Sequence, residues 1–130
     1  MSTNAGIAVK TGGTFQTIYC HWDGSPNYML PMLRNNYNSL ELATKLVSMG
    51  YASIIEKKLE PDPSKPHDFD HYQEDVCVFY HRDRGDDWES YSPVCYSKRE
   101  LFQVPAFDYV YIFENGQWTA YTGRGTKLNV

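Results

Sequence analysis

The stretch that decides the fold is DYVYIFENGQWTAYT, residues 108–122, near the end of the chain. Apolar and aromatic residues fill both of its halves, and Asn115-Gly116 lies between them. This dipeptide is typical of a type I′ turn, because both residues tolerate the positive φ angles that such a turn needs. The stretch therefore predicts a β-hairpin with strands at 108–113 and 117–122.

A second hairpin is predicted at the other end of the chain. Residues 6–10 and 15–22 are rich in β-branched and aromatic side chains, and they flank Thr11-Gly12-Gly13, whose glycines suit a tight turn. Apolar runs predict further strands at 76–80 and 94–96. Together these segments predict an antiparallel sheet of about four to six strands, with hairpins at both ends.

Two short helices are predicted after the first hairpin. The first covers about 28–36, where Pro31 would be tolerated only in the first turn. The second begins after Asn38, which can cap it with Glu41 three residues later, and Gly50 is a natural residue to end it. Its apolar stripe consists of Leu40, Ala43, Leu46 and Val47. The fold class predicted is α+β.

The whole chain, 1–130, is expected to form one domain, because its length leaves no room for a second core. Residues 56–75 are polar and contain three prolines, so they predict an exposed loop. The tail, 123–130, is expected to be flexible. The 109–121 hairpin would suit a homodimer interface, and it would suit a core equally well.

Charge and cysteine content exclude several classes. The formal net charge is −4, without the clustered basic residues of a nucleic-acid binder, so direct nucleic-acid binding is not expected. Three cysteines at wide spacing form neither a disulfide framework nor a CxxC metal pattern. No apolar run approaches the length of a membrane span, so we expect a cytoplasmic protein with no membrane partner.

Residues 81–87, HRDRGDD, are the first candidate site, because they follow a predicted buried strand. Arg82 and Arg84 beside a glycine could hold a phosphate or carboxylate, since the guanidinium fork suits bidentate anion contacts. The alternating charges also suit a plain turn whose arginines pair with Asp83, Asp86 and Asp87.

Residues 60–75 are the second candidate. His67, Asp70 and His71 are residue types that bind zinc, manganese or iron, although Pro66 precedes them and no HExxH pattern is present. The plainer reading is a solvated acidic loop. Its carboxylates outnumber its single lysine, Lys65; they are Glu60, Asp62, Asp68, Asp70, Glu74 and Asp75.

The third candidate is YCHWDG, residues 19–24. Cys20 and His21 are neighbours on a strand and point to opposite faces, so they do not predict a catalytic dyad, and Cys20 is expected to be a small buried group. Trp22 and Asp23 could line a pocket, or Asp23 could cap the next helix. The chain has no phosphate-binding glycine loop and no GxSxG elbow, which disfavours an enzyme, and no cofactor is expected.

The strings IYCHWDG at 18–24, with Pro26, and YHRDRG at 80–85 resemble motifs of a family of small phage and prophage proteins. The resemblance extends from about Gly6 to Tyr121. The family has no assigned mechanism. The resemblance implies a phage-encoded protein that acts in the host cytoplasm. Ser25 departs from the aromatic residue that often follows the motif.

Small phage proteins of this kind often counter host defence, which leaves two binding functions and one enzymatic function open. The leading hypothesis is sequestration of a nucleotide signal by aromatic faces and arginines. Its residues are Trp22, Asp23, Tyr80, His81, Arg82, Arg84, Trp88 and Tyr91. The alternative is a protein-blocking inhibitor, anti-CRISPR-like or DNA-mimicking, that contacts a host defence protein through the acidic residues 60–75. The third is a metal-dependent hydrolase that uses His67, Asp70 and His71.

Overall fold

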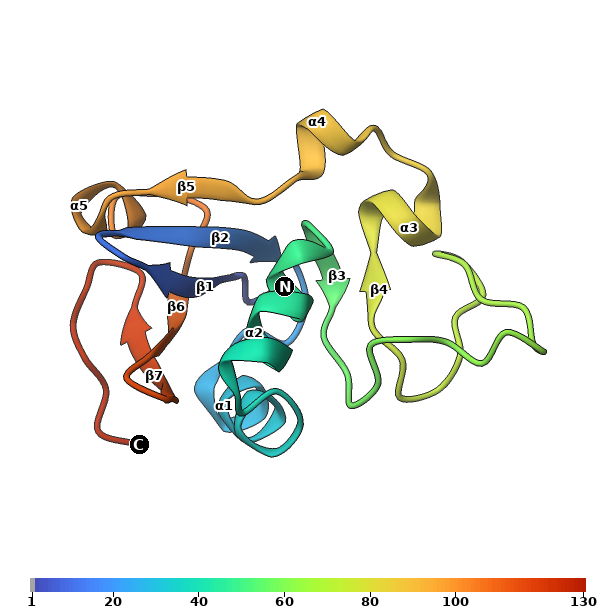
Figure 1. Cartoon of the computed structure of the whole chain (residues 1–130), viewed down its shortest axis with the longest axis horizontal. Coiled ribbons are helices and arrows are strands. Elements are labelled where there is room, and N and C mark those ends of the chain that lie inside the picture. The colour runs from blue at the N-terminus through green and yellow to red at the C-terminus, as the bar shows by residue number, and fades with distance from the viewer. Residues whose placement is uncertain (1) are drawn as a thin grey trace.

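The computed structural model describes residues 2–130 (Figure 1). Among these residues a seven-stranded mixed sheet has the order β4-β3-β2-β1-β6-β7, and β5 also pairs with β2. The strands are β1 (Ala5–Thr11), β2 (Thr14–Cys20), β3 (Ala52–Ile54), β4 (Val78–Phe79), β5 (Val94–Tyr96), β6 (Tyr109–Glu114) and β7 (Gln117–Thr122). Five short helices accompany the sheet. The predicted α+β class is confirmed.

Both predicted hairpins are present. β6 and β7 pair antiparallel with Phe113 opposite Trp118, and Asn115 and Gly116 have φ angles of 53° and 77°. These two positive φ angles are the reason for the Asn-Gly dipeptide. β1 and β2 form the other hairpin, with Ile7 opposite Ile18.

The sequence predicted an antiparallel sheet. The sheet is mostly antiparallel, but it also contains two parallel pairings. β1 lies at its centre and pairs parallel with β6, so that Ile7 is opposite Tyr111. β2 and β3 also pair parallel, at Cys20 and Ala52. These two pairings join segments that are far apart in the sequence, and no local turn signal specifies them.

The first helix, α1 (Pro26–Asn36), begins two residues earlier than predicted. Pro26 occupies the first turn, where a missing N–H costs nothing. Pro31 therefore lies inside the helix, not in its first turn, and its exposed position keeps the freed carbonyl of the preceding turn near water.

The second helix, α2 (Leu40–Ser48), is capped by Ser39 and not by Asn38, because the Ser39 side chain accepts a hydrogen bond from the Leu42 N–H at 3.1 Å. Ala43, Leu46 and Val47 are buried as predicted, whereas Leu40 is 61% exposed. Gly50 has a φ of 85°, the left-handed conformation expected after a helix end.

The two faces of the sheet are covered unequally. α1 and α2 pack on one face and bury the larger core, which includes Ile18, Leu33, Leu46, Tyr111 and Trp118. The other face carries a smaller core around Phe15, Leu101, Phe107 and Val110, beneath α5 (Lys98–Leu101). Tyr19 and Tyr96 border this smaller core and are only partly buried.

The remaining helices, α3 (Tyr80–Arg84) and α4 (Trp88–Tyr91), follow β4 directly, and they lie with loop 56–75 at the end of the molecule away from the β6–β7 hairpin (Figure 1). The predicted strand 76–80 is shorter in the structure, because Tyr80 already begins α3. Gly85 ends α3 with a φ of 83°. The sequence predicted a turn over these residues, where the structure has a helix.

The tail, residues 123–130, was predicted to be flexible, but it folds back against β7. The Leu128 N–H donates to the Ala120 carbonyl at 2.9 Å, and the Thr122 N–H donates to the Thr126 carbonyl at 2.8 Å. Arg124 donates to the carbonyls of Val104 and Phe107. The residues of the 109–121 hairpin that would suit a dimer interface are largely in the core, since Val110, Tyr111, Ile112 and Trp118 are buried.

Candidate functional site

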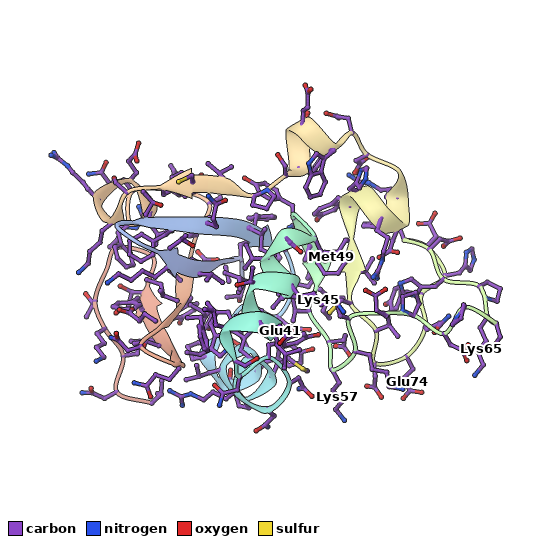
Figure 2. All side chains as sticks on the ribbon, in the orientation of Figure 1. Glu41, Lys45, Met49, Lys57, Lys65 and Glu74 are labelled. Carbon is purple, nitrogen blue, oxygen red and sulfur yellow. The ribbon has the colours of Figure 1, made fainter. Side chains whose placement is uncertain are left out.

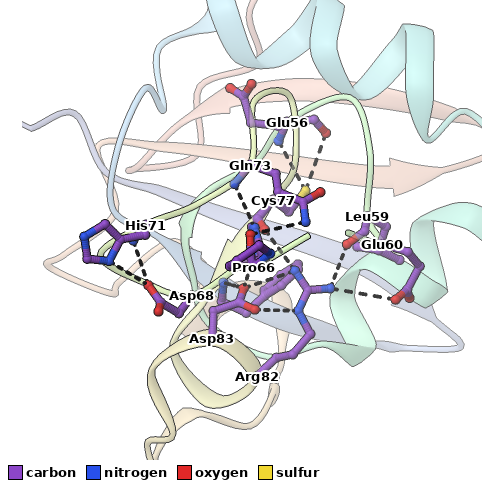
Figure 3. A network of polar contacts seen from close by, with 12 residues as sticks. Glu56, Leu59, Glu60, Pro66, Asp68, His71, Gln73, Cys77, Arg82 and Asp83 are labelled. Carbon is purple, nitrogen blue, oxygen red and sulfur yellow. Dashed lines mark hydrogen bonds and ion pairs between the residues drawn. The ribbon is translucent and has the colours of Figure 1, made fainter. Parts of the chain in front are cut away.

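A buried polar network joins α3 to loop 56–75 (Figure 3). Arg82 makes a bidentate contact with Asp83, with Nε to Oδ1 at 2.8 Å and Nη2 to Oδ2 at 3.0 Å. Arg82 also donates to the carbonyl of Leu59 at 2.7 Å and to that of Cys77 at 2.9 Å. Its donors are therefore occupied by the protein itself, and Arg82 fixes the loop in place.

Asp83 is the centre of this network, and its side chain is 3% exposed. One of its oxygens accepts the Phe79 N–H at 2.8 Å, and His67 Nε2 lies 3.5 Å from the same oxygen. His67 Nδ1 accepts the Gln73 N–H at 2.9 Å, so the Nε2 atom carries the proton in the neutral ring and points to Asp83. His67 is thus a buried part of the loop anchor.

Arg84 is more exposed but is also paired. Its Nε donates to Asp86 Oδ2 at 2.7 Å, and its guanidinium lies over the rings of Phe69 and Tyr80, at 4.8 and 4.7 Å from the ring centroids. The internal pairing considered in the sequence analysis is therefore present, between Arg82 and Asp83 and between Arg84 and Asp86, although both arginines lie on a short helix and not in a turn. Asp87 does not pair with them: it caps α4 by accepting the Ser90 N–H at 3.0 Å.

Three of the aromatic residues predicted for a site, Trp22, Tyr80 and Tyr91, lie in one continuous row of rings. The row passes through adjacent pairs whose ring centroids are 4.7 to 6.1 Å apart. In order, it contains Trp22, His21, Tyr19, Tyr51, Tyr91, Tyr80 and Phe69. Trp88 stands beside it and contacts His81, with ring centroids 5.2 Å apart.

The row is held rigidly by the backbone. The Tyr51 N–H donates to the Tyr91 carbonyl at 2.8 Å, and the Tyr80 N–H donates to the Tyr51 carbonyl at 3.2 Å. The Tyr19 hydroxyl and His21 Nδ1 are hydrogen-bonded at 2.7 Å. Burial raises the pKa of Tyr19, Tyr51 and Tyr80, so these phenols stay neutral at physiological pH.

A cavity of about 290 Å³ opens between the two ends of the row, Trp22 and Phe69. Trp22 and Asp23 from the segment after β2 line it, together with Phe69 and Tyr72 from the loop and Ser53, Ile54 and Val78 from β3 and β4. Asp23 has a φ of 56° and does not cap α1, whose N-cap residue is Ser25. The pocket role considered for Trp22 and Asp23 matches this placement.

Cys20 is fully buried beside β3, as predicted for a small apolar group. Burial raises the pKa of its thiol to about 12. At physiological pH the thiol is therefore protonated and is a poor nucleophile. His21 is on the opposite side of the strand, hydrogen-bonded to Tyr19.

The acidic residues of the loop divide into two groups. Asp62 and Asp68 form turns: Asp62 accepts from Ser64, and Asp68 accepts the N–H groups of Asp70 and His71. These hydrogen bonds lower the pKa of both carboxyl groups. Glu60, Asp70 and Glu74 are exposed, and Glu74 projects outward from the loop (Figure 2). Asp75 is partly exposed with a φ of 63°.

The structure does not bring the predicted metal ligands together. The His67 side chain is 3% exposed and faces Asp83, whereas the His71 side chain is 85% exposed beside Asp68. Within residues 2–130, no group of three or more histidine, cysteine, aspartate or glutamate side chains is arranged to hold a metal ion.

Several residues of this surface were missed by sequence reasoning. Tyr19, Tyr51, Phe69 and Tyr72 belong to the row or the cavity, but they come from separate segments. The eleven tyrosines of the chain are the only signal for Tyr19, Tyr51 and Tyr72, and they do not say which tyrosines gather; the composition gives no signal for Phe69. Gln73 was also missed: its side-chain amide bonds Asp62 and Lys65 and so ties the loop together.

No family model, curated protein or solved structure matches the chain. Among the helices of residues 2–130, none has both the length and the apolar character needed to cross a membrane.

Proposed function

We propose that this protein is a non-enzymatic binding protein whose rigid acidic loop attaches to a basic surface of a partner protein. The observation that carries the proposal is the anchoring of the loop by Arg82. Arg82 donates to the Leu59 carbonyl of the loop, and its bidentate partner Asp83 contacts the loop through His67 and through the Phe69 N–H. A loop held at these three residues presents its carboxylates in a fixed arrangement, which lowers the entropy cost of binding.

Charge supports the same conclusion. Residues 60–75 carry six carboxylates and one lysine, and the chain as a whole has a net charge of −4. A surface of this kind attracts a basic partner over a distance of about one Debye length, about 8 Å at physiological ionic strength. Arg82 and Arg84 are both neutralised by aspartates, so they offer little to a phosphate.

The biological setting that we propose comes from the motifs at 18–24 and 80–85, which resemble those of phage and prophage proteins. In that setting the partner is a host defence protein, the binding takes place in the host cytoplasm, and blockade of a basic channel or active site disables the defence. Nucleic-acid-processing defence proteins have such basic surfaces because they bind phosphates.

The test is a plaquing assay in bacteria that carry individual defence systems and express this protein. We expect restored phage plaquing against one system. The double substitution Asp70→Lys and Glu74→Lys should abolish the rescue, because it replaces two exposed carboxylates with cations in the contact surface. Neither side chain forms a turn or a hydrogen bond within residues 2–130, so the fold should persist, as circular dichroism would show.

The matched control is Glu41→Lys with Glu89→Lys, which changes net charge equally on helices α2 and α4. Figure 2 shows Glu41 on α2, apart from the loop. The control should keep the rescue. Loss of rescue in both double variants would mean that net charge, and not the loop, is responsible, and this would contradict the proposal.

A second candidate function is sequestration of a nucleotide signal, and the row of rings from Trp22 to Phe69 favours it. Base–aromatic stacking contributes about 1–3 kcal/mol per base. Arg84 lies at the Phe69 end of the row with part of its guanidinium exposed. This candidate predicts that Arg84→Ala abolishes rescue and a nucleotide-induced thermal shift, whereas Asp70→Lys with Glu74→Lys leaves both intact.

A further inference from the structure

The cavity between the two ends of the aromatic row, Trp22 and Phe69, is lined by exposed aromatic side chains and one carboxylate. Three aromatic side chains line it, and two of them are strongly exposed: Trp22 at 46% and Tyr72 at 61%. Large aromatic side chains are usually buried unless they contact something else. The third ring, that of Phe69, is partly buried. The backbone N–H of Phe69 donates a hydrogen bond to the Asp83 carbonyl at 2.9 Å, which fixes this part of the loop to α3.

Among residues 2–130, Asp23 supplies the one carboxylate that lines this cavity. Asp23 lies three residues after the end of β2, and the neighbouring Trp22 N–H donates to the Ser53 carbonyl at 2.9 Å, so the segment is fixed to β3. The positive φ of Asp23 places this residue in a conformation that side chains other than Asn, Asp and Gly rarely adopt. The backbone therefore holds an acid at the edge of an aromatic cavity.

The size of the cavity limits the ligand. Its volume of about 290 Å³ lies at or below the lower end of the roughly 300–1,000 Å³ typical of sites for drug-sized molecules. It has room for the end of one long side chain and not for a dinucleotide. The ligand class is therefore set by what aromatic rings and one carboxylate recognise together.

Aromatic faces and a carboxylate both attract cations. Ring quadrupoles bind ammonium and guanidinium groups, and a carboxylate adds a charge-assisted hydrogen bond. The protein already contains one such contact on Phe69, whose ring lies under the Arg84 guanidinium. Arg84 itself is neutralised by Asp86, so it does not cancel the charge of Asp23.

We propose that this cavity receives the guanidinium or ammonium group of a single arginine or lysine side chain of the partner. This inference rests on the proposed binding of a basic partner and narrows it to one inserted side chain. The exposed carboxylates of loop 56–75 attract the partner, and the cavity formed by Trp22, Asp23, Phe69 and Tyr72 fixes its position.

The experiment uses three pentapeptides as probes: Gly-Gly-Arg-Gly-Gly, Gly-Gly-Lys-Gly-Gly and the neutral Gly-Gly-Gln-Gly-Gly. Binding is followed by NMR through the indole N–H signal of Trp22. We expect the arginine or lysine peptide to shift this signal in a saturable way and the glutamine peptide to leave it unchanged. No shift with either cationic peptide, or equal shifts with all three, would overturn the inference.

The variant Asp23→Asn keeps the shape of the side chain, and asparagine tolerates a positive φ, so the fold is preserved. It should weaken binding of the cationic peptide about tenfold, because it removes a charge-assisted hydrogen bond. Trp22→Ala should also weaken binding, followed in this variant through the backbone amide signal of Tyr72 because the indole is absent, whereas Trp88→Ala should not. Trp88 is the matched control because it is 41% exposed and lies outside the cavity.

The two proposals fail separately. If the peptide binds as expected but Asp70→Lys with Glu74→Lys leaves phage rescue intact, the proposed function fails and the cation site remains. If the lysine substitutions abolish rescue but Asp23→Asn and Trp22→Ala change neither peptide binding nor rescue, the proposed function remains and the cation site is wrong.

Discussion

Replacing Arg82 by methionine removes four hydrogen bonds at once and leaves the Asp83 carboxylate buried without a counterion. Breaking a buried ion pair by removing one partner is strongly destabilising, so we expect the free energy of unfolding to fall by about 3 kcal/mol. Urea denaturation followed by circular dichroism measures this loss.

Arg84→Met is the control at the residue scale. Arg84 pairs with Asp86 at the surface, where its side chain is 42% exposed, and such pairs contribute little. The loss should be a small fraction of that for Arg82→Met. Equal losses would show that Arg82 is not the anchor of the loop.

The different roles of Arg82 and Arg84 show why the sequence alone leaves two interpretations of residues 81–87 open. The run HRDRGDD is compatible with anion binding and with internal pairing, since both need the same residue types. What decides the matter is the burial of Asp83, and this depends on Leu59, His67 and Phe79 around it. Leu59 and His67 come from a loop whose path the local sequence does not specify.

At the scale of elements, Gln73 determines how firmly loop 56–75 is held. Its side chain accepts the Asp62 N–H at 2.8 Å and donates to the Asp62 and Lys65 carbonyls. In Gln73→Ala, hydrogen exchange of the Asp62 amide should accelerate about fivefold, because a hydrogen bond contributes roughly 1 kcal/mol. Exchange in β6 should not change, since the core is untouched.

Gln103→Ala provides the control, because Gln103 is exposed and its side chain makes no hydrogen bond within residues 2–130. Exchange at Asp62 should be the same as in the unsubstituted protein. If Gln73→Ala leaves the Asp62 amide equally protected, then the side-chain contacts of Gln73 do not order the loop.

Elements with local signals are the ones that sequence reasoning predicts. Asn115-Gly116 specifies the β6–β7 hairpin by its φ angles alone, and the fold agrees. The helix at 80–84 is missed because a five-residue helix has little periodicity, and its end at Gly85 is the only clear signal. The parallel pairing of β1 with β6 is missed because it joins residues about 100 positions apart, and no short pattern encodes such a contact.

At the scale of the whole molecule, stability should fall at alkaline pH. Burial raises the pKa of Cys20 from 9.0 to about 12, and burial with a hydrogen bond to Glu114 raises the pKa of Tyr121 from 10.0 to about 12. The unfolded chain therefore releases these protons at lower pH than the folded chain does. Their contribution to stability is complete below pH 9 and is lost as the pH rises towards 12.

Urea denaturation between pH 8 and pH 11 measures this effect. We expect a decline that starts near pH 9 with Cys20, at about 1 kcal/mol per pH unit, and steepens above pH 10 as tyrosines contribute. Tyr121→Phe should make the upper part of the decline less steep. A free energy of unfolding that is constant up to pH 11 would contradict the burial of these groups.

The binding surface belongs to the whole molecule, which is why only part of it is predictable. Trp22, Tyr80 and Tyr91 follow from their places beside strands and turns. Tyr51 and Phe69 join them only because β3 pairs with β2 and because the loop is tied to Asp83. The row of rings is a consequence of tertiary structure, and the composition signals only that tyrosines are abundant.

The central position of β1 has a consequence for how the chain is made. Translation releases β6 about a hundred residues after β1, so one edge of the middle strand has no partner while these residues are made. Unpaired strand edges of partly folded chains promote aggregation. Ribosome-bound chains that stop before residue 109 should therefore stay protease-sensitive and depend on chaperones until the β6–β7 hairpin supplies the missing partner of β1.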